Sequence, residues 1–316
     1  MSNSENREWI KRIAQRVLGL PPLPTLIAKL IEMIDNPRTN ARSLGKLIST
    51  DQVLTARILK LANSSFYGFP RRISTVNLSL VVLGFDTLKN LCISVSMREW
   101  FSDNETSGDF DMSRFWEHSI ACGIAAKMIA RECGYMISGE VFVAGLLHDI
   151  GKLVLKQYIK PEFKEIIDTV KKENILFIEA EKRILGIHHG TIGSWLADKW
   201  NLPKHLVEAI AYHHNPQNAE KYYVQTAIVH FANYLTRAAK IGYSGDNGIS
   251  EFDISVAENF KLKRNKDGSV NIDYYVLQLK EEIEKAETFI NLIQGKETLE
   301  LDEKVIKNKK IAYVNK

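Results

Sequence analysis

The sequence predicts an all-α protein, on two observations. Nearly every segment of the 316 residues spaces its apolar positions by three or four, and almost none alternates as a half-buried strand does. With 45% hydrophobic and 25% charged residues, the composition is that of a globular chain with a sizeable core. We therefore expect helices packed on helices throughout, divided into blocks by polar and glycine-rich stretches.

An N-terminal helical subdomain is predicted over residues 15–105, after a segment over residues 1–14. Its first helix follows a proline pair and ends at Asn36 and Pro37. The next helix is expected to begin with a capping box formed by Ser49 and Gln52. The inward positions of these two helices are Leu26, Leu30, Ile34, Leu54, Ile58 and Leu61. Further helices are predicted over about residues 75–83 and 86–101.

A polar stretch over residues 102–111 is expected to separate this subdomain from a second helical block over residues 112–241. Residues 242–248, GYSGDNG, form the next break. Beyond it, residues 249–316 are predicted as a C-terminal helical extension with a basic tail. Apolar residues repeat there at Val276, Leu279, Ile283, Ala286, Ile290 and Ile293. Such a seam either docks on the body of the protein or pairs with a second copy, and fewer than three heptads favour docking over a homodimer.

All eight histidines lie between residues 118 and 230, within the second block. His118 lies on the inward face of its helix, and His148 stands beside Asp149 in the apolar run GLLHDIGKLVL, residues 145–155. Two tandem pairs follow, His188 with His189 and His213 with His214. Each histidine taken alone is more typical of a hydrogen-bonded core residue. Together they need many partners, and a shared metal ion would satisfy them at once.

Imidazole and carboxylate ligands without thiolates predict one or two divalent transition-metal ions, from iron, manganese, nickel, cobalt or zinc. Cys92, Cys122 and Cys133 have no paired spacing and are expected to be reduced core residues. No apolar run approaches the roughly 18 residues that span a bilayer, and no secretory segment is apparent. The sequence therefore predicts a cytoplasmic protein without a membrane partner.

A DNA-binding function is also considered, because residues 43–62 resemble a helix-turn-helix. The second helix of that motif would open with Asp51, which repels phosphate, and its apolar face is better explained as core. The net charge of +4 is too small to indicate a nucleic-acid partner. We therefore expect no DNA partner.

Six ordered segments resemble the HDOD domain, the HD-related output domain of bacterial signalling proteins, and the wider HD superfamily of metal-dependent phosphohydrolases. They are LPPLPTLIAKL, LANSSFYGFPRRISTVNLSLVVLGFDTLKNL, FWEHSIACGIAAKMIA, GLLHDIGKLVL, HHGTIGSWLADKWNLP and AIAYHHNP. The resemblance covers about residues 15–240. It implies that residues 112–241 form an HD-like helical bundle that carries the metal site.

The resemblance also implies the site residues. Its metal ligands correspond to His118, His148, Asp149, His189, His213, His214 and Asn233. If two ions bind, Asp149 would be the carboxylate that bridges them, and Lys152, suited to a phosphate, would join it as a catalytic residue. Asn233 departs from the family pattern, which has an aspartate there, and a neutral amide is the weaker ligand. His230, one turn earlier, is a substitute ligand to consider. The GYP motif of the related HD-GYP enzymes is absent, which argues against a cyclic-di-GMP phosphodiesterase of that type.

Two functions remain open at this point. The first is a bacterial signal-transduction protein with a retained but altered metal site, little or no turnover, signalling proteins as partners and a phosphate-containing ligand. Asn233 and an N-terminal subdomain without obvious catalytic groups favour it. The second is an active phosphohydrolase on a nucleotide or cyclic nucleotide, which the remaining histidines and Asp149 favour.

Overall fold

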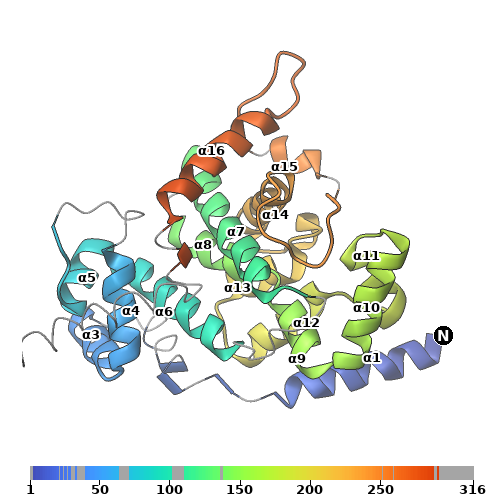
Figure 1. Ribbon diagram of the computed structural model, residues 1–316, viewed down its shortest axis with the longest axis horizontal. Coiled ribbons are helices and arrows are strands. Elements are labelled where there is room, and N and C mark those ends of the chain that lie inside the picture. Colours follow the sequence, from blue (N-terminus) through green and yellow to red (C-terminus); the bar gives the residue numbers. More distant parts are fainter. Residues whose placement is uncertain are drawn as a thin grey trace, which may run out of the picture.

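The computed structural model describes residues 3–20, 22–23, 25–26, 28–29, 33, 40–63, 71–101, 110–135, 138–250, 252–258, 260–287 and 290–291. Within those residues every regular element is a helix, apart from one isolated antiparallel bridge between Arg264 and Val270. The all-α prediction is therefore confirmed (Figure 1). No helix in the described ranges combines the length and the apolar character that crossing a bilayer requires.

The helices follow one another along the chain with the following bounds. They are α1 (Asn3–Leu18), α3 (Ala41–Ser49), α4 (Gln52–Ala62), α5 (Val76–Leu83), α6 (Phe85–Trp100), α7 (Met112–Glu132), α8 (Ser138–Leu147), α9 (Ile150–Tyr158), α10 (Lys160–Glu173), α11 (Phe177–Leu185), α12 (His189–Lys199), α13 (Lys204–Tyr212), the 3₁₀ turn η1 (Pro216–Asn218), α14 (Tyr223–Ala238), α15 (Ile254–Glu258) and α16 (Ile272–Lys285).

Helices α3, α4 and α5 form a group at the left of Figure 1, and α6 leads from them to α8 in the rest of the protein. Leu54, Ile58 and Leu61 are buried, as predicted. The predicted capping box is wrong, because Ser49 ends α3 and its hydroxyl donates to the Gly45 carbonyl. Asp51 caps α4 instead, accepting from the Leu54 amide at 2.9 Å. Most of the helix expected after the proline pair, and residues 102–109 of the expected boundary, lie outside the described residues.

Helix α7 is buried over most of its length and contacts α8, α14 and α16. Helices α9 to α12 lie beside this centre, and α1 packs against α11 and α12 (Figure 1). The Lys199 ammonium of α12 donates to the carbonyls of Leu18 and Leu20 and so provides hydrogen-bond donors at the C-terminal end of α1. The division expected between residues 14 and 15 therefore falls inside one helix, and that helix lies on the histidine-bearing block.

The C-terminal seam docks on the body of the protein. Leu279 and Ala286 are fully buried, and α16 contacts α7 and α14. The Arg131 guanidinium of α7 donates to the Glu282 carboxylate at 2.9 Å across this interface. Ile293, the last position of the predicted seam, and the lysine-rich tail lie outside the described residues. Docking is the first of the two alternatives that the repeat allows, and the homodimer stays an untested prediction.

Candidate metal centre

The His148–Asp149 pair lies at a break between two helices and not inside one, as the apolar run GLLHDIGKLVL had suggested. Helix α8 ends at Leu147, and α9 begins at Ile150 with Asp149 as its N-cap residue. An N-cap aspartate ordinarily accepts a hydrogen bond from the first turn of its helix. At this junction the Asp149 carboxylate accepts from no backbone amide of α9 and bonds to that helix through the Lys152 ammonium, at 2.7 Å. It faces the histidines instead, which explains why a buried helix boundary carries a carboxylate.

Four separate segments bring imidazoles to this carboxylate. His118 comes from α7, His148 from the α8–α9 break, His189 from the first residue of α12 and His213 from the end of α13. Their Nε2 atoms lie 3.9, 3.4, 3.0 and 3.6 Å from the nearer Asp149 oxygen, in that order. All of these side chains are buried. The structure therefore gathers at one point residues that are spread over about a hundred positions in sequence.

Three of the imidazoles are oriented through their other ring nitrogen. His148 Nδ1 lies 2.7 Å from the Gly145 carbonyl and His213 Nδ1 lies 2.9 Å from the Ile210 carbonyl. A carbonyl only accepts, so Nδ1 carries the proton in both rings. His189 Nδ1 donates in the same way to the Glu181 carboxylate at 2.6 Å. Each Nε2 atom is thereby turned toward Asp149, which is the arrangement that outer partners impose on metal-binding histidines.

The Nε2 atoms of His189, His213 and His214 lie as close together as the ligands of one cation would. His189 Nε2 lies 3.3 Å from His213 Nε2 and 2.9 Å from His214 Nε2. Lone pairs this close repel each other unless a proton or a metal ion lies between them. His118 Nε2, His148 Nε2 and Asp149 Oδ1 have no hydrogen-bond partner within the described part of the chain, although all are buried. The donor set therefore fits a divalent transition metal.

The ligand atoms fall into two groups that share Asp149. One comprises His118, His148 and Asp149, and the other comprises Asp149, His189, His213 and His214; within each group the atoms lie within 4.8 Å of one another. Three or four nitrogen and oxygen ligands at this separation match the number that a zinc or iron ion takes from protein. The arrangement is suited to a metal ion in either group.

The electrostatics of the centre favour positive charge beside Asp149. Burial raises the pKa of a carboxyl, but His148 and Lys152 outweigh it and hold the pKa of Asp149 well below its usual range. Burial lowers the pKa of His148, yet the Asp149 carboxylate raises it to about 10. Burial and the neighbouring His148 hold the pKa of His118 and His213 well below normal. A metal ion would satisfy the same preference for positive charge.

Lys152 is buried and fully engaged. Its ammonium donates to Asp149 Oδ2 at 2.7 Å, to the Ser244 carbonyl at 2.9 Å and to the Ser244 hydroxyl at 3.3 Å. It also lies 5.1 Å from the centre of the Phe177 ring. The lysine predicted to hold a phosphate therefore neutralises Asp149 in this arrangement, with the loop over residues 242–248 covering it.

Asn233 and His230, both on α14, have different surroundings. The Asn233 side chain is buried, and its Oδ1 has no hydrogen-bond partner among the described residues. His230 uses both ring nitrogens, since Nδ1 donates to the His213 carbonyl at 2.8 Å and Nε2 accepts from the Asp253 amide at 3.2 Å. His230 is therefore a structural residue and not a substitute ligand, whereas Asn233 still has an oxygen to offer.

Three contributors to the centre are missing from the sequence prediction. Glu181 lies on the buried face of α11 with Phe177 and Leu185 and bonds to His189. Its position among apolar residues of one helical face is the feature of the sequence that could have indicated a buried role. Ser244 belongs to a stretch that the sequence marks only as a break. Gly151 lets α9 approach α12, because a Cβ there would lie 1.9 Å from the His189 carbonyl oxygen. Without that approach His189 could not reach Asp149.

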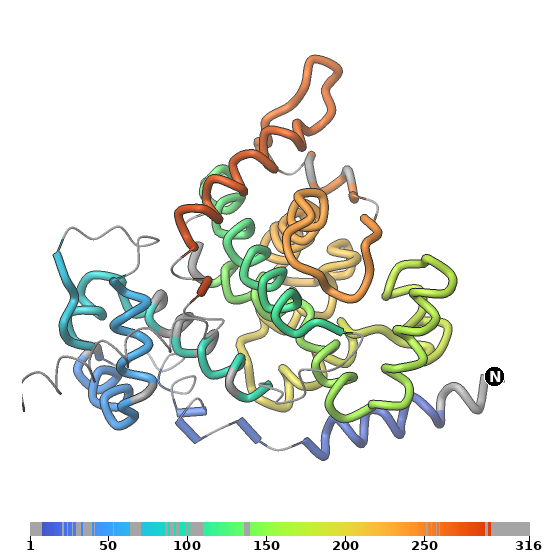
Figure 2. The backbone as a smooth tube through the Cα atoms, in the orientation of Figure 1, coloured from blue at the N-terminus to red at the C-terminus, as the bar shows by residue number. Residues whose placement is uncertain are grey.

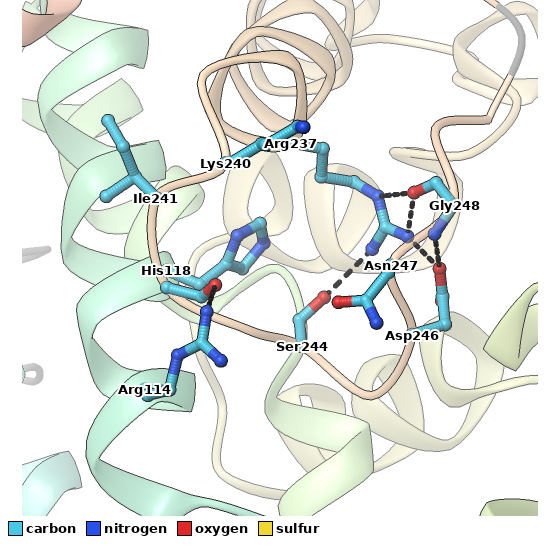
Figure 3. A pocket seen from close by; sticks show the side chains of 10 residues that line it. Arg114, His118, Arg237, Lys240, Ile241, Ser244, Asp246, Asn247 and Gly248 are labelled. Carbon is cyan, nitrogen blue, oxygen red and sulfur yellow. Dashed lines mark hydrogen bonds and ion pairs between the residues drawn. The ribbon is translucent and has the colours of Figure 1, made fainter. Parts of the chain in front are cut away.

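Two cavities open beside the centre. One, of about 600 Å³, is lined by both polar and aromatic side chains, including His188, His214, Trp195 and Tyr212. The other, of about 330 Å³, lies on the His118 side between α7, the end of α14 and residues 242–248 (Figure 3). The two groups of ligand atoms therefore each have a neighbouring space that a small molecule can enter.

Comparison with known proteins identifies the family and the fold of the chain. A family model described as HDOD domain matches residues 20–216. The structure of an HDOD domain protein of unknown function from Geobacter sulfurreducens has a TM-score of 0.73 and 27% identity, covering 89% of this chain and 97% of that one. A candidate signal transduction protein from Marinobacter aquaeolei shares the fold at TM-score 0.71 and 22% identity, over 93% of this chain and 66% of that one.

Two curated relatives are longer than this chain. An uncharacterised protein from Treponema pallidum is 28% identical over 227 residues, which are 71% of this chain and 44% of that protein. Ribonuclease Y from Thermus thermophilus is 34% identical over 107 residues, 34% of this chain and 14% of the enzyme. The chain thus spans less than half the length of either relative. Since the family model covers more than half of the chain, and its segments carry the clustered histidines, the chain belongs to the HDOD domain family.

Proposed function

We propose that the chain is a regulatory HDOD protein of bacterial signal transduction that binds one or two divalent metal ions with little or no turnover. The observation that carries the proposal is Asp149, a buried carboxylate shared by two groups of imidazoles whose ring nitrogens gather around it. Burying this many imidazoles around a carboxylate is unfavourable unless their polar atoms have partners, and this supports metal binding. The neutral Asn233, in place of an acidic ligand, supports a regulatory over a catalytic role.

The residues of the chain would divide the work as follows. A divalent ion, when bound, lowers the pKa of a coordinated water and polarises a phosphoryl oxygen. His118 and His148 would hold it together with Asp149, to which Asn233 would add its oxygen, and His189, His213 and His214 would form the second group with Asp149. Glu181 fixes the ring of His189. Lys152 balances the charge of Asp149 and, held by Ser244, is not free to bind a substrate phosphate.

One observation favours the second candidate, an active phosphohydrolase. His214 and His188 line the cavity of about 600 Å³, and the pKa of His188 is lowered to about 3, chiefly by burial, so its ring is neutral there. A cavity of this size accommodates a small-molecule ligand. A nucleotide that entered it would reach the group formed by His189, His213 and His214.

Metal analysis of untagged protein tests the proposal, with His148→Ala beside the wild type. His205→Ala is the matched control, since His205 lies outside the cluster, 3.7 Å from Glu140. We expect bound metal in the wild type and in His205→Ala, and almost none in His148→Ala. Near-zero metal in all three would return the histidines to an ordinary core role.

Turnover separates the two functions. Nucleotides and cyclic nucleotides are incubated with the wild type in the presence of each candidate metal. The regulatory proposal predicts product release no faster than in His148→Ala. Rapid release that depends on His148 would contradict it and establish the hydrolase.

A further inference from the structure

The cavity on the His118 side is lined by cationic side chains that stand one helical turn from the metal centre. Arg114 precedes His118 by four residues on α7, and Arg237 follows Asn233 by four on α14. Residues four apart lie on one face of a helix, separated by about 5.4 Å along its axis. Because α7 and α14 pack together and both arginines line the same cavity, they form a layer beside His118. Lys240 lines the cavity and is exposed.

The wall of this cavity favours an anion. Its lining includes three cationic side chains, Arg114, Arg237 and Lys240, against one carboxylate, Asp246. The planar guanidinium donates two parallel hydrogen bonds to a phosphate or carboxylate, which a point charge cannot do. A volume of about 330 Å³ is enough for a phosphate with a small organic group. The chemistry of the wall therefore indicates a phosphate monoester or diester.

Arg237 already holds an anion in this structure, supplied by the chain itself. It donates to the Ser244 hydroxyl at 3.0 Å and to the Gly248 carbonyl at 2.9 Å, and its remaining terminal nitrogen contacts the Asp246 carboxylate (Figure 3). Asp246 also accepts from the amides of Gly248, at 2.8 Å, and Phe177, at 3.0 Å. The same terminal nitrogen that contacts Asp246 also contacts the Gly248 carbonyl, and these four N–H contacts leave Arg237 little capacity for a ligand. A phosphate can bind it fully only by taking the place of Asp246.

We propose that this cavity binds the phosphate group of a small ligand, and that Asp246 occupies the place of that phosphate on Arg237 until the ligand displaces it. The site rests on the proposed function, since it would present the phosphate beside His118. Displacement of Asp246 has a further effect, because the same loop holds Lys152 through Ser244. Ligand binding is thereby coupled to the release of Lys152 from its cover.

Calorimetric titration of the full chain with inorganic phosphate tests the site, at constant ionic strength. Asp246→Asn removes the internal competitor and is expected to bind phosphate about tenfold more tightly than the wild type. Lys240→Gln, at an exposed position, is expected to bind several-fold more weakly without loss of folding. Arg237→Gln is expected to abolish binding, and its far-ultraviolet circular dichroism shows whether it folds. Arg183→Gln, an exposed arginine paired with Glu173, is the control.

Two outcomes would overturn the site. Equal phosphate affinity in the wild type, Asp246→Asn and Lys240→Gln would mean that the cavity is not involved, even if Arg237→Gln fails to fold. Titration of chelator-treated protein separates this proposal from the metal proposal. Binding that vanishes with the metal and ignores Lys240→Gln would place the phosphate on the metal alone. Binding that survives chelation and follows the cavity variants supports the cavity, whatever the metal analysis gives.

Discussion

Backbone carbonyls set the chemistry of the individual residues at the metal centre. Gly145 and Ile210 provide the acceptors for His148 and His213, three residues after each carbonyl. A fixed partner on Nδ1 removes the freedom of the ring to flip or to change tautomer. The rings of His148 and His213 are therefore already oriented before an ion binds. The entropy lost in ordering them is lost when the chain folds and not when the ion binds.

Asn233→Asp is the informative change at this scale, because it restores the acidic residue of the family pattern. The Asn233 oxygen is buried and without a hydrogen-bond partner in the described structure, so a carboxylate there would need a cation. We expect the variant to bind divalent metal more tightly, by roughly tenfold or more, and to be less stable than the wild type in chelator. Competition with a chromophoric chelator and thermal melting measure the two effects.

Asn218→Asp, on the 3₁₀ turn, controls for the added negative charge. Unchanged metal affinity in Asn233→Asp, together with unchanged stability in chelator, would show that position 233 does not face the ion.

The metal centre depends on the ends of helices. His148 and Asp149 lie between α8 and α9, His189 begins α12 and His213 follows α13, and among these gathered residues His118 alone comes from a helix interior. Helix ends can be aimed at a point independently of the packing angle along the helix, and small residues such as Gly151 allow the close crossing.

Lys127 gives the interface of α7 and α16 a pH dependence. Burial, with the neighbouring Arg131, lowers its pKa from 10.5 to about 8, against the attraction of Glu282. Between these two values the unfolded chain holds a proton that the folded chain has lost, so stability rises with pH. Below about pH 8 both states are charged, and the folded state carries the full cost of burying the ammonium. We expect Lys127→Met to be more stable than the wild type at pH 7, by a margin that narrows toward pH 10.

Urea denaturation at several pH values measures this margin, with Lys280→Met on the exposed face of α16 as the control. A margin that stays constant from pH 7 to pH 10 would contradict the assignment.

One continuous hydrophobic core joins the helices of the whole molecule, from Ile13 on α1 to Ala286 after α16. Metal bound at its centre should stabilise the chain as a unit, because an ion that binds only the folded state shifts the unfolding equilibrium. At a free metal concentration one hundred times the dissociation constant, the melting temperature is expected to rise by roughly 5 °C above that in chelator. Calorimetry of the wild type measures the rise. His148→Ala should lose it, and a rise retained in that variant would point to binding elsewhere.

The helical fold and most of the centre follow from the sequence, and the reasons for the exceptions are physical. His118, His148, Asp149, His189 and His213 come together as the family pattern implied. The break at residues 148–149 was hidden, because a buried helix junction is as apolar as a helix interior. Ser244 and Asp246 could not be foreseen, since a turn-forming composition does not say what the turn covers. Residues 240–250 return from α14 to the N-terminal end of α7, where the Tyr243 amide donates to the Arg114 carbonyl (Figure 2).

Helix α12 connects the amino-terminal helix to the metal centre. Its first residue is His189. Its last residue is Lys199, whose ammonium donates to the Leu18 carbonyl at the end of α1. A helix of eleven residues resists compression and bending over such a short span. A displacement of α1 away from the bundle would therefore move α12 as a unit. It would thereby shift the His189 imidazole, whose Nε2 lies 3.0 Å from Asp149.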